Sequence, residues 1–185
     1  VAGELNEGLT DASFMYSASG VVKMDNPLPS TLKNIDSMFY CCKLKEIDWK
    51  IVDNVTIDSA KNTFAGCNKL VSIKGEINHI KDGTGLLSSC GFTVMPKFAI
   101  NNVLEIADSM FGTGIGEYKK LESYGGNTLP NSVKSMKYCF AYTDVTEVLP
   151  VPSGITDKNA FKGCYRNCTK LTDVSNMIDF ISSHT

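Results

Sequence analysis

The sequence is short of the features that mark several large classes of protein. It has one arginine, one tryptophan and two histidines among 185 residues, and no apolar run approaches the ~18 residues of a membrane-spanning helix. The formal net charge is −2, and the longest basic run is the pair Lys119–Lys120. Nucleic-acid-binding proteins concentrate arginine and lysine on one stripe. We therefore expect no nucleic-acid partner and no membrane span in this chain.

Metal-binding spacing is also missing. The chain has seven cysteines but no Cys-x-x-Cys pair, and the two histidines lie far in sequence from Cys164 and Cys168, which are four residues apart. Zinc sites need several such ligands at close spacing. We predict no metal and no cofactor, and we leave open whether Cys164 and Cys168 form a local disulfide.

No group of residues suggests catalysis. A cysteine–histidine mechanism needs the two groups in contact, and His79, eleven residues before Cys90, is expected to lie in a solvated loop. The glycines of "GTGIGE" at 112–117 are not followed by the Lys-Ser/Thr pair of a phosphate-binding loop. The prediction is a protein that is not an enzyme.

What the sequence does contain is a repeat. The segment "NTFAGCNKLVSIKGEI" at 62–77 has a bulky anchor, a small residue three positions later, and then two apolar residues three apart. The pattern occurs seven times, with anchors separated by 24, 25, 23, 24, 29 and 25 residues. The anchors are Met15, Phe39, Phe64, Leu87, Phe111, Phe140 and Tyr165. The small residues are Ala18, Cys42, Cys67, Cys90, Gly114, Thr143 and Cys168. The apolar pairs are Val21/Met24, Leu44/Ile47, Leu70/Ile73, Phe92/Met95, Leu121/Tyr124, Val145/Val148 and Leu171/Val174.

A period of this length indicates stacked units that are each too small to bury a core alone. We expect each unit to open with a short helical turn, to point its anchor inward, and to begin a short strand at the apolar pair. The side chains expected to cap the helical turns are Asp36, Asp58, Asp108 and Thr156. The spacing of 29 suggests an insertion of about four residues at "GTGIGEYKK".

The segments "MFYCCKLKEID", "TFAGCNKLVSI" and "CYRNCTKLTDV" resemble the cysteine-containing leucine-rich repeats of the BspA type, found in bacterial surface proteins and in related phage and protozoan proteins. The resemblance covers about residues 10–178. It weakens where Ala18, Gly114 and Thr143 replace cysteine. The family has no catalytic residues to carry over.

The resemblance implies an α/β repeat fold. The expected architecture is a right-handed leucine-rich-repeat solenoid of about seven units of ~24 residues, with one short parallel strand per unit and short helical turns on the other side. Residues 1–185 are expected to form a single solenoid.

The cysteines fall into two expected groups. Cys42, Cys67, Cys90 and Cys168 occupy the small slot, where Ala and Thr also occur, so we expect them to be reduced, buried and inert. Cys41, Cys139 and Cys164 lie outside the small slot and are expected to be exposed or variable.

The solvent face of the predicted sheet is the expected binding surface, because side chains alternate along a strand. The family association with adhesion implies a recognition module for a protein or glycan at a bacterial cell surface, secreted or surface-attached. The alternative is an architectural part such as a stalk or a phage virion or tail component. The expected binding residues are Glu46, Asp48, Ser72, Lys74, Val94, Pro96, Phe98, Glu147, Leu149 and Asp173.

Overall fold

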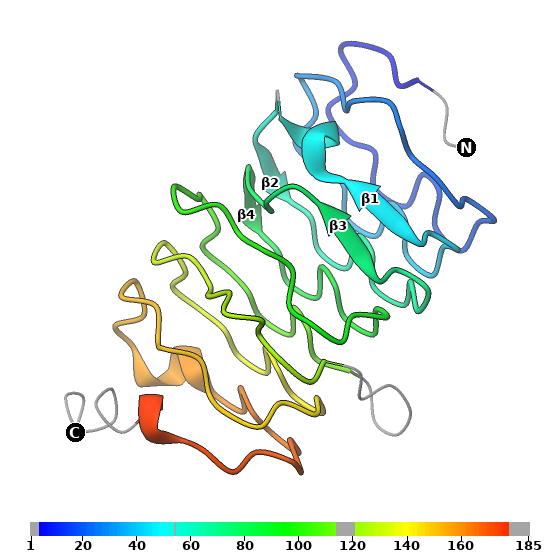
Figure 1. Cartoon of the computed structure of the whole chain (residues 1–185). Coiled ribbons are helices and arrows are strands. Elements are labelled where there is room, and N and C mark those ends of the chain that lie inside the picture. The colour runs from blue at the N-terminus through cyan, green and yellow to red at the C-terminus, as the bar shows by residue number, and fades with distance from the viewer. Residues whose placement is uncertain (1–3, 54, 114–120, 178–185) are drawn as a thin grey trace.

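The computed structural model describes residues 4–53, 55–113 and 121–177 as a stack of similar turns (Figure 1). The regular elements in that part of the chain are short. The strands are β1 (Glu46–Asp48), β2 (Ile57–Ser59), β3 (Ser72–Lys74) and β4 (Ile80–Asp82). The 3₁₀ helices are η1 (Trp49–Val52) and η2 (Lys158–Phe161). Residue Gly114 and most of the expected insertion lie outside the described residues.

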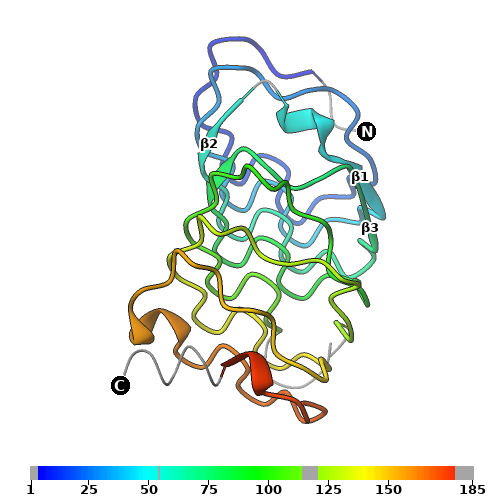
Figure 2. The same cartoon turned by 60° about the vertical axis from the view of Figure 1, so that its left-hand side comes forward.

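Two columns of parallel pairing run along the stack, on opposite sides in Figure 2. The first joins β1 to β3 and continues as the bridges Val94–Ser123 and Glu147–Asp173. The second contains β2 and β4 and was not predicted; the expectation of one strand per unit is therefore wrong. The second column passes in order through Asp11, Asn34, Ser59, Asp82, Ile106 and Ser135.

Charges of alternating sign follow the second column on its solvent side. The lysines and acids in each pair come from successive turns, as in Lys81–Asp58 and Lys134–Glu105. These side chains are about half exposed, so solvent screens each pair and its contribution to stability is small. Their regular alternation shows instead that the column has one fixed register. In order, the residues are Lys33, Asp58, Lys81, Glu105 and Lys134.

The segments around the anchors are runs of β-turns, so the expected helical turns are wrong, apart from η2, which begins close to the expected Thr156. Two positions of nearly every turn have φ between 52° and 76°, a left-handed conformation that no α-helix contains and that type II turns require. Two residues before the anchor, with Tyr16 instead of Met15 as the anchor of the first turn, these are Phe14, Ser37, Asn62, Gly85, Ser109, Tyr138 and Gly163. Two residues after it, they are Ala18, Cys41, Gly66, Ser89, Tyr142 and Asn167.

The left-handed residues divide the backbone hydrogen bonds into two alternating sets. In the turn of Phe39, every second N–H donates to the next turn along the stack, at 2.7–2.9 Å: Ser37 to Lys61, Phe39 to Thr63 and Cys41 to Ala65. The intervening N–H groups donate three residues back within the turn: Met38 to Ile35, Tyr40 to Ser37 and Cys42 to Phe39. Each turn is therefore closed on itself and bonded to its neighbour at once.

Two of the expected capping residues act between turns. Asp36 Oδ1 accepts from the hydroxyl of Ser59 and the N–H of Lys61, both at 2.7 Å. Asp108 makes the same pair of contacts with Ser135 and Lys137. None of the four expected residues caps a helical turn: Asp36 and Asp108 bond to the next turn instead, Asp58 pairs with Lys81, and Asp157 rather than Thr156 caps η2.

The anchors form the core as two columns of stacked rings. Tyr16, Phe39 and Phe64 stack at 5.5 and 5.6 Å between ring centroids. Phe111, Phe140 and Tyr165 stack at 5.5 Å each. Leu87, 2% exposed, occupies the gap between the two columns. The first anchor is therefore Tyr16, and the expected anchor Met15 is 43% exposed.

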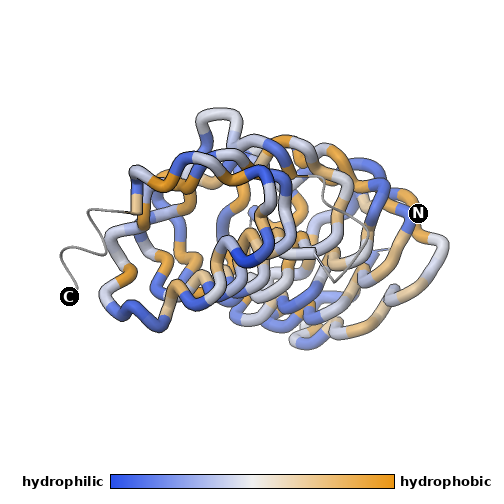
Figure 3. Tube along the Cα trace, turned by 90° about the horizontal axis from the view of Figure 1, so that it is seen from below, coloured by the Kyte–Doolittle hydropathy of each residue, from blue (hydrophilic) through white to orange (hydrophobic). Residues whose placement is uncertain are grey.

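Seen from below, the successive turns overlay one another between the two termini, and hydrophobic and hydrophilic residues alternate along the tube (Figure 3). The interior is filled by one continuous apolar cluster that includes Trp49, whose indole N–H donates to the Asn78 carbonyl at 3.1 Å. Within the described residues, no helix has the length and apolar character needed to cross a bilayer.

Candidate functional site

The first column of strands presents the surface that we call the β1–β3 face. Glu46 lies beside Ser72, and Asp48 lies beside Lys74, in a parallel register. The side chains of the face are exposed or half-buried, as the alternation of strand residues predicts. The face comprises Glu46, Asp48, Ser72, Lys74, Val94, Glu147 and Asp173.

Three residues expected on this face are buried: Pro96, Phe98 and Leu149. Phe98 is 6% exposed and meets Phe111 edge-on, with ring centroids 6.3 Å apart. Leu149 is 4% exposed, and its N–H donates to the Tyr165 hydroxyl at 3.0 Å. The prediction extended strand alternation two residues too far at Leu149 and up to four too far at Phe98, because the chain turns inward directly after the pairing at Val94 and Glu147.

The β1–β3 face carries charges of both signs. Lys74 Nζ lies 3.0 Å from Glu46 Oε1, so two neighbouring turns are linked by an exposed ion pair. At the C-terminal side, hydrogen bonds from the backbone and side chain of Ser175 lower the pKa of Asp173 below its ordinary value. The face therefore offers paired charges, the carboxylate of Asp173 and one exposed valine, Val94, at 48%.

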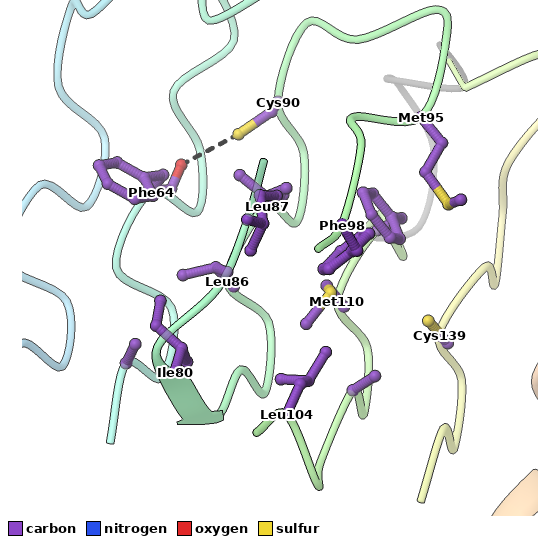
Figure 4. Close-up of a cluster of buried hydrophobic side chains, with 14 of the residues drawn as sticks. Phe64, Ile80, Leu86, Leu87, Cys90, Met95, Phe98, Leu104, Met110 and Cys139 are labelled. Atoms are coloured by element: carbon purple, nitrogen blue, oxygen red, sulfur yellow. Dashed lines mark hydrogen bonds between the residues drawn. The ribbon is translucent and has the colours of Figure 1, made fainter. Parts of the chain in front are cut away.

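The cysteines of the small slot have a structural task. Each thiol donates to the carbonyl of the anchor one turn earlier, and Figure 4 shows the bond from Cys90 to Phe64. The distances are 3.0–3.2 Å for the pairs Cys42–Tyr16, Cys67–Phe39, Cys90–Phe64 and Cys168–Phe140. A thiol suits this position because it is small, apolar and still a weak donor.

Burial makes these thiols unreactive. Burial raises the pKa of Cys67 to about 12 and raises that of Cys90 well above the ordinary 9.0. The expectation that the four small-slot cysteines are buried and reduced is confirmed. Among the described residues, no three His, Cys, Asp or Glu side chains are placed to hold a metal.

Of the two alternatives expected for Cys139 and Cys164, exposure is wrong. Both are at most 2% exposed, and both have a pKa raised by burial. They directly precede the anchors Phe140 and Tyr165, where other turns have buried Met38, Leu86 and Met110. That apolar row was a usable signal in the sequence. Cys41 is exposed as expected, and Cys164 and Cys168 are both free thiols.

A comparison with known families gives one match. The family model described as the BspA type leucine rich repeat region matches residues 12–114 in six copies, a range that covers more than half of the 185 residues. No curated protein and no solved structure matches the chain.

Proposed function

Because the chain belongs to the BspA-type leucine-rich-repeat family, we propose that it is a non-enzymatic recognition module whose β1–β3 face binds a protein or glycan at a bacterial cell surface. Repeat proteins of this kind use an extended face built from many equivalent positions. The proposal includes seven units wound in a right-handed solenoid and a secreted or surface location.

The observation that carries the proposal is the register of the β1–β3 face. The first residues of β1 and β3, Glu46 and Ser72, pair in parallel, and the equivalent residues of later turns pair in the same way as Val94–Ser123 and Glu147–Asp173. Equivalent side chains are thereby held in a row on a rigid backbone while their chemistry varies from turn to turn. Such a row suits the recognition of an extended partner.

A binding screen with matched variants tests the proposal. The chain is applied to arrays of extracellular proteins and of glycans. Any partner found is then titrated against Val94→Arg, on the face, and Val103→Arg, away from it. The two valines are 48% and 41% exposed, so neither change should unfold the protein. We expect Val94→Arg alone to weaken binding.

Equal binding by both variants would place recognition elsewhere on the molecule. Absence of any partner on both arrays, together with incorporation of the chain into a larger particle or stalk, would favour the architectural role.

A further inference from the structure

A cavity on the loop side of the stack is separate from the β1–β3 face. It is open to solvent and has a volume of about 260 Å³ between three loops that lie side by side, 98–100, 128–131 and 150–152. These loops are on one edge of the stack in Figure 1, running from green to orange. Its lining contains no charged side chain and none of the seven residues of the β1–β3 face.

The cavity exists because the backbone pairing between turns stops at this edge. The bridge between Ile77 and Phe98 joins two turns, but it has no counterpart from Phe98 to the later loops within the described residues. Three lining residues are prolines, which have no N–H to donate: Pro130, Pro150 and Pro152. The loops therefore stay apart instead of closing into a third column.

The rim of the cavity has unused binding capacity. Within the described residues, the backbone N–H and C=O groups of Ile100, Thr128 and Val151 meet no protein partner. The side chain of Ile100 is 93% exposed, the highest value among the large apolar residues. Below the rim, Phe98 and Leu129 are 6% and 5% exposed and give the cavity an apolar floor.

We propose that this cavity binds an extended protein segment, which inserts one uncharged, bulky apolar side chain between Ile100, Leu129 and Val151. The volume lies below the ~300–1,000 Å³ of pockets for whole small molecules, and it suits a single side chain. The walls offer no counter-charge, so a lysine or aspartate would be desolvated without a partner. The segment's own backbone would pair with the free groups at the rim, as when a peptide adds to a sheet edge.

A glycan fits the cavity less well. The polar side chains of the lining are those of Thr128 and Asn131, and the Asn131 side-chain oxygen already accepts from the Ser153 N–H at 3.2 Å. A sugar could use the free backbone groups at the rim, but the hydroxyl groups that it buried against the apolar floor of Phe98 and Leu129 would stay unpaired, and each would cost binding energy. The cavity chemistry therefore favours a protein segment.

The test uses blocked amino-acid amides as probes. The intact, isotope-labelled protein is titrated with N-acetyl-tryptophanamide, N-acetyl-leucinamide, N-acetyl-lysinamide and methyl glucoside, and backbone amide shifts are followed by NMR. We expect the tryptophan and leucine amides to shift the amides of Ile100, Thr128 and Val151, and the lysine amide to leave them unmoved. Ile100→Asp should weaken this binding at least about tenfold.

Val22→Asp is the control, because Val22 is 50% exposed and lies outside the cavity lining. The proposal is overturned if no probe shifts the cavity residues, if the lysine amide binds as well as the leucine amide, or if the two aspartate variants behave alike. A response to methyl glucoside alone would overturn it in favour of a glycan site. The β1–β3 face is tested separately, so either site can fail alone.

Discussion

At the scale of single residues, the thiols separate into one accessible group and six inaccessible ones. Cys41 is exposed, whereas Cys42, Cys67, Cys90, Cys139, Cys164 and Cys168 are buried. A thiol-labelling reagent should therefore modify one cysteine per native molecule and seven after denaturation. Mass spectrometry of the labelled protein counts the sites. Rapid native labelling of Cys139 or Cys164 would contradict their burial.

The raised pKa of Cys67 predicts that stability falls in alkali. The unfolded thiol titrates near 9.0, and the folded thiol at about 12. Below pH 9 the thiol is protonated in both states, and its stabilising contribution is fully present. Between pH 9 and 12 the thiol of the unfolded state loses its proton while that of the folded state keeps it, so the free energy of unfolding decreases. The slope is at most ~1.4 kcal/mol per pH unit for one thiol. Urea titrations of the native chain and Cys67→Ala should show a shallower decline in the variant.

Burial of Phe98 changes what its truncation should do. Phe64 and Phe98 are 1% and 6% exposed, so Phe64→Ala and Phe98→Ala should each cost about 3–5 kcal/mol, from lost transfer energy and the remaining cavity. Phe14, at 65% exposure, provides the control, and Phe14→Ala should cost under about 0.5 kcal/mol. Chemical denaturation measures all three. A Phe98→Ala variant as stable as Phe14→Ala would return Phe98 to the solvent face.

At the scale of elements, the first column of strands could be predicted, but the second column and the turns could not. The apolar pair Leu44 and Ile47 locates the segment that contains β1, and the register at Glu46 and Ser72 follows from the period. Left-handed φ values leave a sequence signal only where glycine or asparagine occurs, as at Gly85, Gly163 and Asn62. Ser37 and Tyr138 adopt the same conformation because the hydrogen bonds to neighbouring turns impose it.

The close spacing of adjacent turns predicts a sharp difference between two glycines. A Cβ atom at Gly91 would lie 2.7 Å from the Asn68 carbonyl oxygen and 3.1 Å from that of Leu70, whereas one at Gly20 would meet nothing within 4 Å. Gly91→Ala should therefore cost about 1–3 kcal/mol as the turns are forced apart. Gly20→Ala should be nearly neutral. Thermal unfolding of the two variants measures the difference, and equal melting temperatures would refute the close approach.

At the scale of the whole molecule, the core has a weak point where the ring columns are interrupted. Leu87 separates the column that ends at Phe64 from the one that begins at Phe111. In a repeat array each turn is stabilised chiefly by its neighbours. Leu87→Ala should cost about 2–5 kcal/mol and uncouple the two halves. Leu129→Ala removes the same number of side-chain atoms from a buried leucine in the loop 128–131. Because Leu129 does not lie between the two ring columns, this change should leave the two halves coupled.

Hydrogen exchange followed by mass spectrometry distinguishes these outcomes. In Leu87→Ala, peptides on the two sides of residue 87 should exchange at different free energies of opening, whereas in Leu129→Ala they should open together. Uniform acceleration along the whole chain in both variants would show that the array unfolds as one unit.

The candidate binding face could be predicted only in part, because its edge depends on contacts between residues of different turns. The position of the face followed from the seven occurrences of the repeat pattern, but its edge did not. Phe98 packs against the ring of Phe111, and the N–H of Leu149 donates to the hydroxyl of Tyr165. The local sequence pattern cannot reveal these contacts. The cavity at the proline loops depends on the absence of backbone pairing between those loops. The pattern of residue types along the sequence does not indicate which loops lack such pairing.

The alternating hydrogen bonds of the turns make the repeats structurally equivalent units. Each turn meets the next through main-chain N–H and C=O groups whose spacing hardly depends on which side chains are attached. A duplicated block of about one period could therefore be spliced between two existing turns and find its bonding partners already in place. Each added block would lengthen the molecule by the ~4.8 Å that separates paired strands. Recombination can therefore change the length of the molecule in equal steps, without changes to the turns on either side of the added block.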